Sequence, residues 1–290
     1  MTRTWPTVAC VLAALTVTGR APAAAQSWRT ESLSRQVHGE DQLALEIRFS
    51  AGRLRIAPGD AGMLYQAEFR YDGDLFRSEA EYTPSDRHLL LGLMLRDRRH
   101  DLSWDHDLPQ YLDLKLSPAV PVGLELQFGA AEAEIDLGGL SLVAAEIRTG
   151  ASASQIAFTS PNRIRCRGLE VVAGGAEFAM EGLGNARCER IEFHGGAGDL
   201  TLGFTGAWDP GTVTRVEIGV GVAELTLRFP TDVGVSVDLS RFLASFESDR
   251  FVRRGGRYYT RNFDDADVKL IIDISAALGA IDVEWVPPEG

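Results

Sequence analysis

The sequence is poor in lysine and cysteine. Lys115 and Lys269 are the only lysines among 29 basic residues, which stand against 41 Asp and Glu and leave a formal net charge of −12. Such an acidic balance excludes nucleic acid and anionic lipid as partners of the molecule as a whole. We attribute the scarcity of lysine itself to genomic base composition rather than to function.

A long hydrophobic run is missing beyond the N-terminus, so no later segment predicts a membrane span. The first 25 residues combine Arg3, the short apolar run "VACVLAALTV" and the small residues "APAAAQ". This pattern is typical of a secretory signal peptide cleaved after Ala25. Cleavage removes Arg3 and Arg20 and takes the net charge from −12 to −14. We therefore expect a periplasmic or extracellular protein without a transmembrane segment in its mature form.

Catalytic and cofactor signatures are missing too: there is no GxSxG elbow, no P-loop and no dinucleotide fingerprint. The sequence therefore predicts no catalytic residue and no cofactor. The stretch "HDLSWDHD" holds side chains that can bind metals, but without HExxH spacing or a nearby cysteine, so we favour an exposed acidic loop. These side chains are His100, Asp101, Asp105, His106 and Asp107.

A repeat is present instead. The segments "NRIRCRGLEVVAGGAEFAM" and "NARCERIEFHGGAGDLTL" match position by position when Cys166 is placed over Cys188. Each unit is an apolar–acid–apolar triplet, a turn of Gly and Ala, and a second alternating triplet. The acids of the eight units are Glu46, Glu125, Glu146, Glu170, Glu192, Glu217, Asp238 and Asp273. The second triplet follows the acid by eight residues in six units and by ten in two, where it starts at Ile135 and Ile156.

Both halves of the unit alternate with period two, which indicates short strands. Short strands joined by small residues at a period in the low twenties indicate a solenoid, because one unit cannot bury its apolar face alone. We predict an all-β protein built as a parallel β-helix or β-solenoid of about seven short rungs, right-handed by the usual preference. Stacking would place Leu169, Ile191 and Val216 above one another in the core.

The repeat also predicts a disulfide. Stacked rungs lie roughly 4.8 Å apart, which falls within the Cα separation of disulfides, about 4.4–6.8 Å. Cys166 and Cys188 occupy the same rung position and are the only cysteines left after removal of the signal peptide. In an oxidising compartment this pair is expected to be bonded.

Three phrases, "LALEIRFSAGRLRIAP", "YLDLKLSPAVPVGLELQFGAAEAEIDLGGLSL" and "LGAIDVEW", resemble the toast-rack domain family. That family includes the LiaF-like cell-envelope stress proteins and related candidate adhesins with short β repeats. The resemblance extends over most of residues 40–286 and implies a coiled all-β arrangement and a non-enzymatic role at the envelope. LiaF-like proteins carry transmembrane helices before this domain, whereas here a signal peptide stands in their place.

The chain divides into a signal peptide (1–25), a less regular N-terminal toast-rack-like β region (26–118) and regular solenoid repeats (119–290). The interval between Asp238 and Asp273 is 35 residues, so it contains an insertion at 248–267 that is expected to project from the coil. Arginines among aromatic rings suit a polyanion, a sugar or a partner protein. We favour a hairpin that covers the end of the core. The candidate partner-binding residues are Arg250, Phe251, Arg253, Arg254, Arg257, Tyr258, Tyr259, Arg261 and Phe263.

The acids of successive units should form one outward column, from Glu125 to Asp238, since apolar residues flank each of them. A divalent cation bridging Glu170, Glu192 and Glu217 is one interpretation. Arg190 and Arg215, two residues before their acids, offer charge compensation as another. We favour a solvated column, because the sequence has no calcium-loop motif and surface charges are mostly hydrated.

Three functions remain open. The leading hypothesis is a secreted envelope protein that binds an envelope protein or a surface polysaccharide, either adhesin-like or related to envelope stress. The alternatives are a polysaccharide lyase or hydrolase that uses the acids of the column, and a purely structural envelope element. A homodimer formed through exposed end strands is compatible with all three.

Overall fold

The computed structural model describes residues 27–96, 109–246 and 249–288. The predicted signal peptide lies outside the described residues. So does the charged stretch with His100, Asp101, Asp105, His106 and Asp107. In the described part of the chain, no helix is long and apolar enough to span a bilayer.

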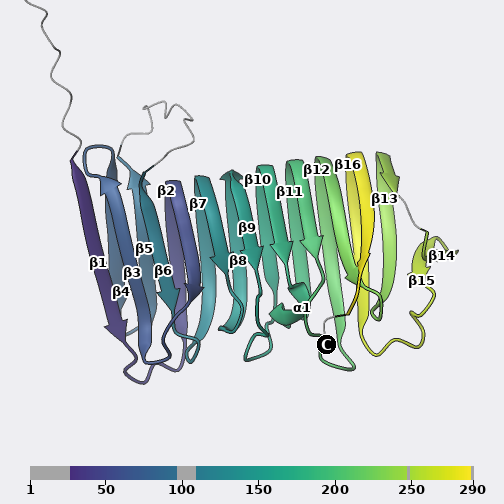
Figure 1. Ribbon diagram of the computed structural model, residues 1–290, viewed down its shortest axis with the longest axis horizontal. Coiled ribbons are helices and arrows are strands. Elements are labelled where there is room, and N and C mark those ends of the chain that lie inside the picture. Colours follow the sequence, from purple (N-terminus) through teal and green to yellow (C-terminus); the bar gives the residue numbers. More distant parts are fainter. Residues whose placement is uncertain (1–26, 97–108, 247–248, 289–290) are drawn as a thin grey trace, which may run out of the picture.

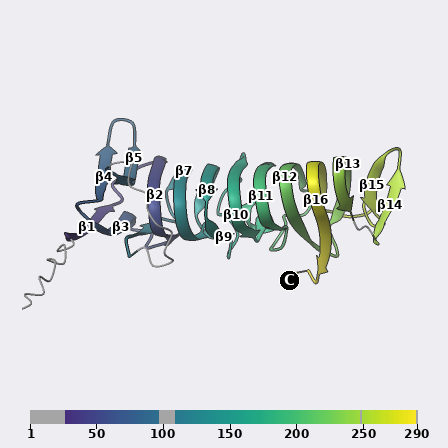
Figure 2. The ribbon, with the colours of Figure 1, turned by 90° about the horizontal axis from the view of Figure 1, so that it is seen from above.

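The protein is an elongated stack of strands, and its parallel, coiled core confirms the predicted all-β, solenoid-like arrangement (Figure 1). Viewed from above, the long strands curve, so that each contributes a first half to one layer and a second half to the opposite layer (Figure 2). The pairing shows the same division, because β10 pairs with β8 through its first half and with β9 through its second half. The strands of the stack are β2 (Leu43–Pro58), β7 (Pro121–Asp136), β8 (Ser141–Ala151), β9 (Ala153–Ala157), β10 (Leu169–Glu181), β11 (Arg190–Gly203), β12 (Val213–Pro230), β13 (Gly234–Phe246) and β16 (Lys269–Val286).

The N-terminal strands close one end of the stack. Strand β5 (His88–Leu95) pairs in parallel with the first half of β2, and β6 (Tyr111–Leu116) pairs with its second half. Antiparallel strands then extend each layer: β4 (Phe76–Thr83) pairs with β5, β3 (Met63–Asp72) with β6, and β1 (Trp28–Gln36) with β3. Strand β2 therefore lies between β5 and β6 on one side and β7 on the other.

The predicted stacking of the core is confirmed. Leu169 pairs with Ile191, and Ile191 pairs with Val216, with each side chain at most 2% exposed. Alternation along each half directs these residues inward and their neighbours outward, which is the pleat of a strand with one buried face.

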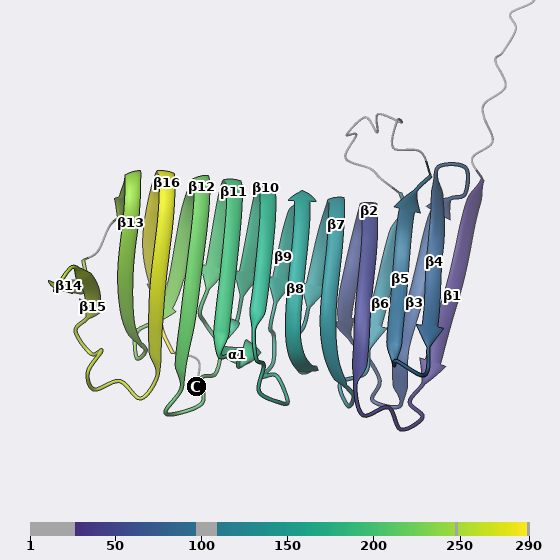
Figure 3. The same ribbon diagram turned by 180° about the vertical axis from the view of Figure 1, so that it is seen from behind.

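The disulfide between Cys166 and Cys188 is confirmed as well. The two residues form an isolated parallel bridge just before β10 and β11, with their Cα atoms 4.2 Å apart. Cys188 follows α1 (Leu183–Ala186), a single short helical turn at the edge of the stack (Figure 3).

The order of the last coils differs from the order of the sequence. The structure inserts β16 between β12 and β13 rather than after β13 (Figure 1). The outer edge of β13 is already occupied by β15 (Arg257–Thr260), which pairs antiparallel with it at Ser236–Tyr259. The last strand therefore adds to the inner edge of β13, and repeat spacing alone carries no information about that choice.

The two units with a ten-residue spacing also differ from expectation. Ile135 pairs with Ile56 rather than with Leu54, whose partner is Ala133. In the next coil Ser154 takes that position, and it pairs with Phe178 of β10. In the backbone pairing, the second half therefore follows the acid by eight residues in every unit. The predicted starts at Ile135 and Ile156 were two residues too late.

Candidate binding surfaces

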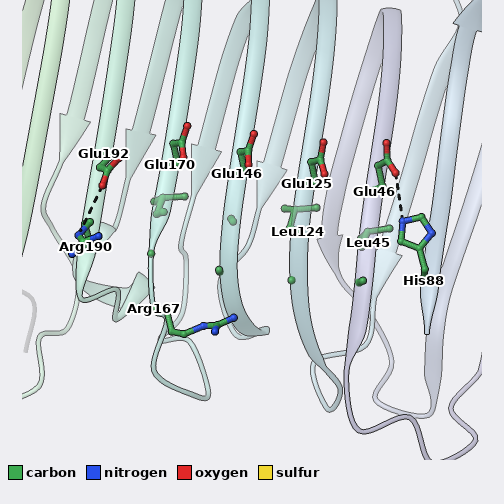
Figure 4. Close-up of a pocket in the computed structure, with 16 residues that line it drawn as sticks. Leu45, Glu46, His88, Leu124, Glu125, Glu146, Arg167, Glu170, Arg190 and Glu192 are labelled. Atoms are coloured by element: carbon green, nitrogen blue, oxygen red, sulfur yellow. Dashed lines mark ion pairs between the residues drawn. The ribbon is translucent and has the colours of Figure 1, made fainter. Parts of the chain in front are cut away.

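The acids of the repeat form one continuous column on the outer face of the first layer. Register pairs join Glu46 to Glu125, Glu125 to Glu146 and so on through Glu170, Glu192 and Glu217. The column ends with Asp273 and then Asp238, because β16 precedes β13 in the stack. The five acids from Glu46 to Glu192 lie in a row in Figure 4.

Two arginines that lie two positions after Glu46 and Glu146 compensate part of the charge of this column. Arg48 pairs with Glu46, and the Nη2 atom of Arg148 lies 2.6 Å from Glu146 and 3.4 Å from Glu170. The hydrogen bond with Glu146, followed by its charge, raises the pKa of the Arg148 guanidinium. Of the arginines two positions before their acids, Arg190 reaches Glu192 only at 3.9 Å.

A groove runs beside the carboxylates across the coils from β5 to β11, with a volume of about 610 Å³ (Figure 4). Its floor has small residues two positions before the first four acids: Ala44, Gly123, Ala144 and Gly168. His88 lies at one end, with its Nε2 atom 3.4 Å from Glu46. Arg167 and Arg190 lie at the other end (Figure 4). The groove thus combines a flat floor with hydrogen-bonding groups that repeat from coil to coil.

At Gly123, packing alone does not explain why the floor of the groove has small side chains. A Cβ atom placed on this residue meets no other atom within 4 Å, and its φ is not in the left-handed region. The register shifts at Val122 and Gly123, so a β-bulge lies here, but a bulge with this backbone accepts other residues. Glycine inside a strand otherwise marks the close approach of a ligand or another backbone.

The groove was only partly predictable. The repeat predicted the acids but not the floor, although "LALE", "VGLE", "VAAE" and "CRGLE" all place Ala or Gly two positions before the acid. His88 belongs to β5, outside the repeat, and only tertiary pairing brings it beside Glu46. The candidate cation ligands Glu170, Glu192 and Glu217 do lie in one column. Within the described ranges, no three Asp, Glu, His or Cys side chains are grouped closely enough to hold a metal ion.

The insertion forms a hairpin of β14 (Phe251–Arg254) and β15, which continues the first layer beyond β13 (Figures 1 and 2). Phe251 and Tyr258 pack against the core, and the rings of both contact Phe246, at 5.8 and 5.1 Å between centroids. The Oγ1 atom of Thr260 accepts a hydrogen bond from the amide of Val235. The hairpin therefore covers the end of the core, as the favoured interpretation of the sequence predicted.

The arginines of the hairpin divide into two groups. Arg257 is half-buried and pairs with Asp273, so it fastens the hairpin to the stack. Arg250, Arg253, Arg254 and Arg261 are exposed. Arg254 also pairs with Asp264 at 2.8 Å, and Arg250 and Arg253 lie against the rings of Trp285 and Tyr258. Tyr259 and Phe263 contact each other edge to face and are half-buried.

Comparison with known proteins identifies the first half of the chain. Residues 23–166 match the model of the N-terminal domain of toast_rack (DUF2154). No curated protein sequence is significantly similar to the chain.

Several solved structures are similar to the chain at low sequence identity. A candidate cell adhesion protein from Clostridium sporogenes ATCC 15579 is 17% identical, with 89% of this chain and 100% of that chain covered and a TM-score of 0.45. A candidate adhesin from Bacteroides fragilis NCTC 9343 is 10% identical, with 89% and 98% covered and a TM-score of 0.42. A candidate lipid-binding protein from Parabacteroides distasonis ATCC 8503 is 9% identical, with 90% and 97% covered and a TM-score of 0.30.

Proposed function

For this chain, which belongs to the toast-rack family through residues 23–166, we propose the role of a secreted cell-envelope protein that acts by binding. Its N-terminal sequence has the pattern of a secretory signal, and this supports action in the periplasm or outside the cell. The proposed ligand is a surface polysaccharide that lies along the groove beside the acid column.

The groove is the observation that carries this proposal. Its five carboxylates repeat from coil to coil, so neighbouring ones lie roughly 4.8 Å apart along the stack. An extended polymer whose own units repeat at a comparable interval meets the same groups at each step. Sugar hydroxyls donate hydrogen bonds to carboxylates, and bonds to charged acceptors are the stronger kind. A groove that is already formed also avoids much of the ordering cost of binding.

Gly123→Leu tests this proposal directly. The new side chain has open space at its Cβ and would extend over the floor of the groove. Ala197→Leu is the matched control, because Ala197 is exposed at the corner of the stack outside the groove. The mature protein is screened against envelope polysaccharides by pull-down and calorimetry.

We expect Gly123→Leu to lose glycan binding and Ala197→Leu to retain it. Equal binding by both variants would contradict the groove. Turnover of the glycan that disappears in Glu192→Gln would replace binding by the enzymatic alternative. Absence of any glycan or protein partner would favour a structural element.

The exposed face of the hairpin is a second candidate contact, for an envelope protein. Arg250, Arg253 and Arg254 are solvent-exposed on or beside β14, and the pairing of the described strands leaves the outer edge of β14 open. An open edge strand accepts a strand from a partner, including a second copy of this chain. Replacing the three arginines by glutamine should abolish capture of such a partner in crosslinking and leave glycan binding unchanged.

A further inference from the structure

A second recess, distinct from the groove, lies at the edge of the stack beside the disulfide. It has a volume of about 240 Å³ and is built by three successive turns of the chain: the one before β10, the one between α1 and β11, and the one between β11 and β12. We call it the arginine cleft. Its lining includes Arg165, Arg187, Glu189, Trp208, Asp209 and Arg215.

The charges of the arginine cleft are incompletely compensated. Arg187 pairs with Asp209 at 2.8 Å, which accounts for one arginine and one acid. Neither Arg165 nor Arg215 forms an ion pair with any residue in the described ranges, and both are exposed. Glu189 is the remaining acid, so the cleft keeps an excess of one positive charge in a chain whose net charge is −12.

The disulfide joins the backbone directly after two of these arginines. Arg165 precedes Cys166 and Arg187 precedes Cys188, and the two cysteines are in parallel register. An anion in the cleft would offset its excess positive charge, and guanidinium binds carboxylate in a planar, two-pronged geometry.

Arg187 has an unfavourable backbone conformation, and its side chain is held by hydrogen bonds. Its φ is 54°, in the left-handed region that glycine prefers at the end of a helix. The side chain is anchored by hydrogen bonds to Asp209 and to the carbonyl oxygen of Asn162, at 2.8 and 3.0 Å. Its Nε atom is buried without a hydrogen-bond partner among the described residues. A strained residue with an unsatisfied donor is typical of a ligand site.

Trp208 supplies a flat apolar surface in the same cleft. Its indole Nε1 donates a hydrogen bond to the carbonyl oxygen of Phe204 at 3.0 Å, and Gly184 lies so close that a Cβ there would come within 2.7 Å of Nε1. The ring is therefore fixed in orientation and half-buried. A fixed indole beside polar groups suits the C–H face of a sugar ring, since indole combines an apolar body with a polar edge.

We propose that the arginine cleft binds an acidic sugar residue of a surface glycan. Arg165 and Arg215 would bind its carboxylate or sulfate, while Trp208 packs against the ring. The cleft volume lies below the about 300–1,000 Å³ of pockets that enclose drug-sized ligands, which fits a single sugar residue rather than a longer segment. No lining residue is shared with the groove, so the two sites are separable by mutation.

Calorimetry on the mature protein with tetragalacturonate as the probe tests the proposal. The variant Arg165→Gln/Arg215→Gln keeps two long polar side chains and removes both charges. Arg53→Gln/Arg55→Gln is the matched control, because these arginines are 61% and 63% exposed and belong to the opposite layer. A neutral galactotetraose and inorganic phosphate are the comparison ligands.

We expect the cleft variant to weaken tetragalacturonate binding at least about tenfold, since each lost bond joins two charged groups. The control variant and Gly123→Leu should bind as wild type does, which separates this site from the groove. The proposal is overturned if wild type does not bind tetragalacturonate at millimolar concentration. It is equally overturned if the cleft variant binds normally, or if galactotetraose or phosphate binds as tightly as the acidic glycan.

Discussion

Cys166 and Cys188 join two adjacent coils through a disulfide at equivalent positions of the repeat, with both side chains at most 2% exposed. The bond closes a loop of 22 residues. In the loop-entropy account, such a loop stabilises the folded state by about 3 kcal/mol. We therefore expect Cys166→Ala/Cys188→Ala to lower the free energy of unfolding by about that amount, measured by urea unfolding with matched slopes.

The non-reduced mature protein should show no thiol that reacts with an alkylating reagent under denaturing conditions. Two reactive thiols would show that the pair is not bonded in the isolated protein. Reduction of wild type should reproduce most of the stability loss of the double variant, which separates loss of the cross-link from loss of side-chain packing.

Because β16 lies between two strands, its core residues should contribute more to stability than those of a strand at the end of the stack. Ile274 is 2% exposed and pairs with Ile218 on one side and with Leu239 on the other. Ile274→Ala should therefore cost about 2–5 kcal/mol of unfolding free energy. Asp282→Ala, on the same strand but at an exposed position, is the control and should change stability by less than about 0.5 kcal/mol. A small effect of Ile274→Ala would argue against the inserted position.

Glu217 is expected to destabilise the fold at low ionic strength. It lies in register between Glu192 and Asp273 and forms no ion pair with any residue of the described part. Glu217→Gln should stabilise the protein by about 0.5 kcal/mol through relief of like-charge repulsion.

Salt distinguishes this effect from a change in packing. At about 1 M salt the Debye length is roughly 3 Å, so the gain from Glu217→Gln should vanish. Glu146→Gln serves as the comparison, because it also removes a hydrogen bond from Arg148 and should gain less. A stabilisation that persists unchanged in high salt would rule out repulsion along the column.

Glu40 couples stability to acid pH. Burial alone would raise its pKa, but hydrogen bonds from the amide of His38 at 2.6 Å and from the Tyr82 hydroxyl at 3.2 Å, together with Arg35, lower it overall. A folded-state pKa below the unfolded value means that the carboxylate contributes stability above the unfolded pKa of about 4.3, and that this is lost as pH falls through the folded pKa.

We therefore expect Glu40→Gln to be less stable than wild type at pH 7, by up to about 1 kcal/mol, as for ion pairs of partly exposed groups. The two unfolding curves should converge as the pH falls through the folded-state pKa of Glu40. Glu189→Gln, an exposed acid without an ion pair in the described ranges, should run parallel to wild type across the same pH range. A constant difference between Glu40→Gln and wild type would contradict the lowered pKa.

In the hairpin, the aromatic residues should contribute to stability and the exposed arginines should not. Tyr258 packs edge to face on Phe246, so Tyr258→Ala should cost about 2 kcal/mol, less than the about 3–5 kcal/mol of a fully buried aromatic residue. Arg253→Gln should leave the melting temperature unchanged, because Arg253 is exposed, lies against the Tyr258 ring and forms no ion pair with a described residue. Equal destabilisation by both would mean that the arginine face, too, serves only to cover the core.

Local regularity explains what the sequence determined by itself. The alternation of apolar and polar residues, the Gly and Ala turns and the constant spacing were sufficient to predict a coiled all-β protein. The match of Cys166 to Cys188 predicted the disulfide, because parallel strands place equivalent residues of neighbouring units next to each other. The outward column of acids followed from the same pleat.

Only the tertiary structure determined which strand edges pair with each other. Every coil offers similar backbone donors and acceptors on both sides, so the local sequence does not specify a place for β16 between β12 and β13. In the folded protein, β15 of the hairpin pairs with the outer edge of β13, and β16 pairs with its inner edge. Backbone pairing likewise overrode side-chain hydrophobicity where Ala133, not Ile135, pairs with Leu54. The groove and the arginine cleft combine residues from different coils and from β5, which become neighbours only once the stack has formed.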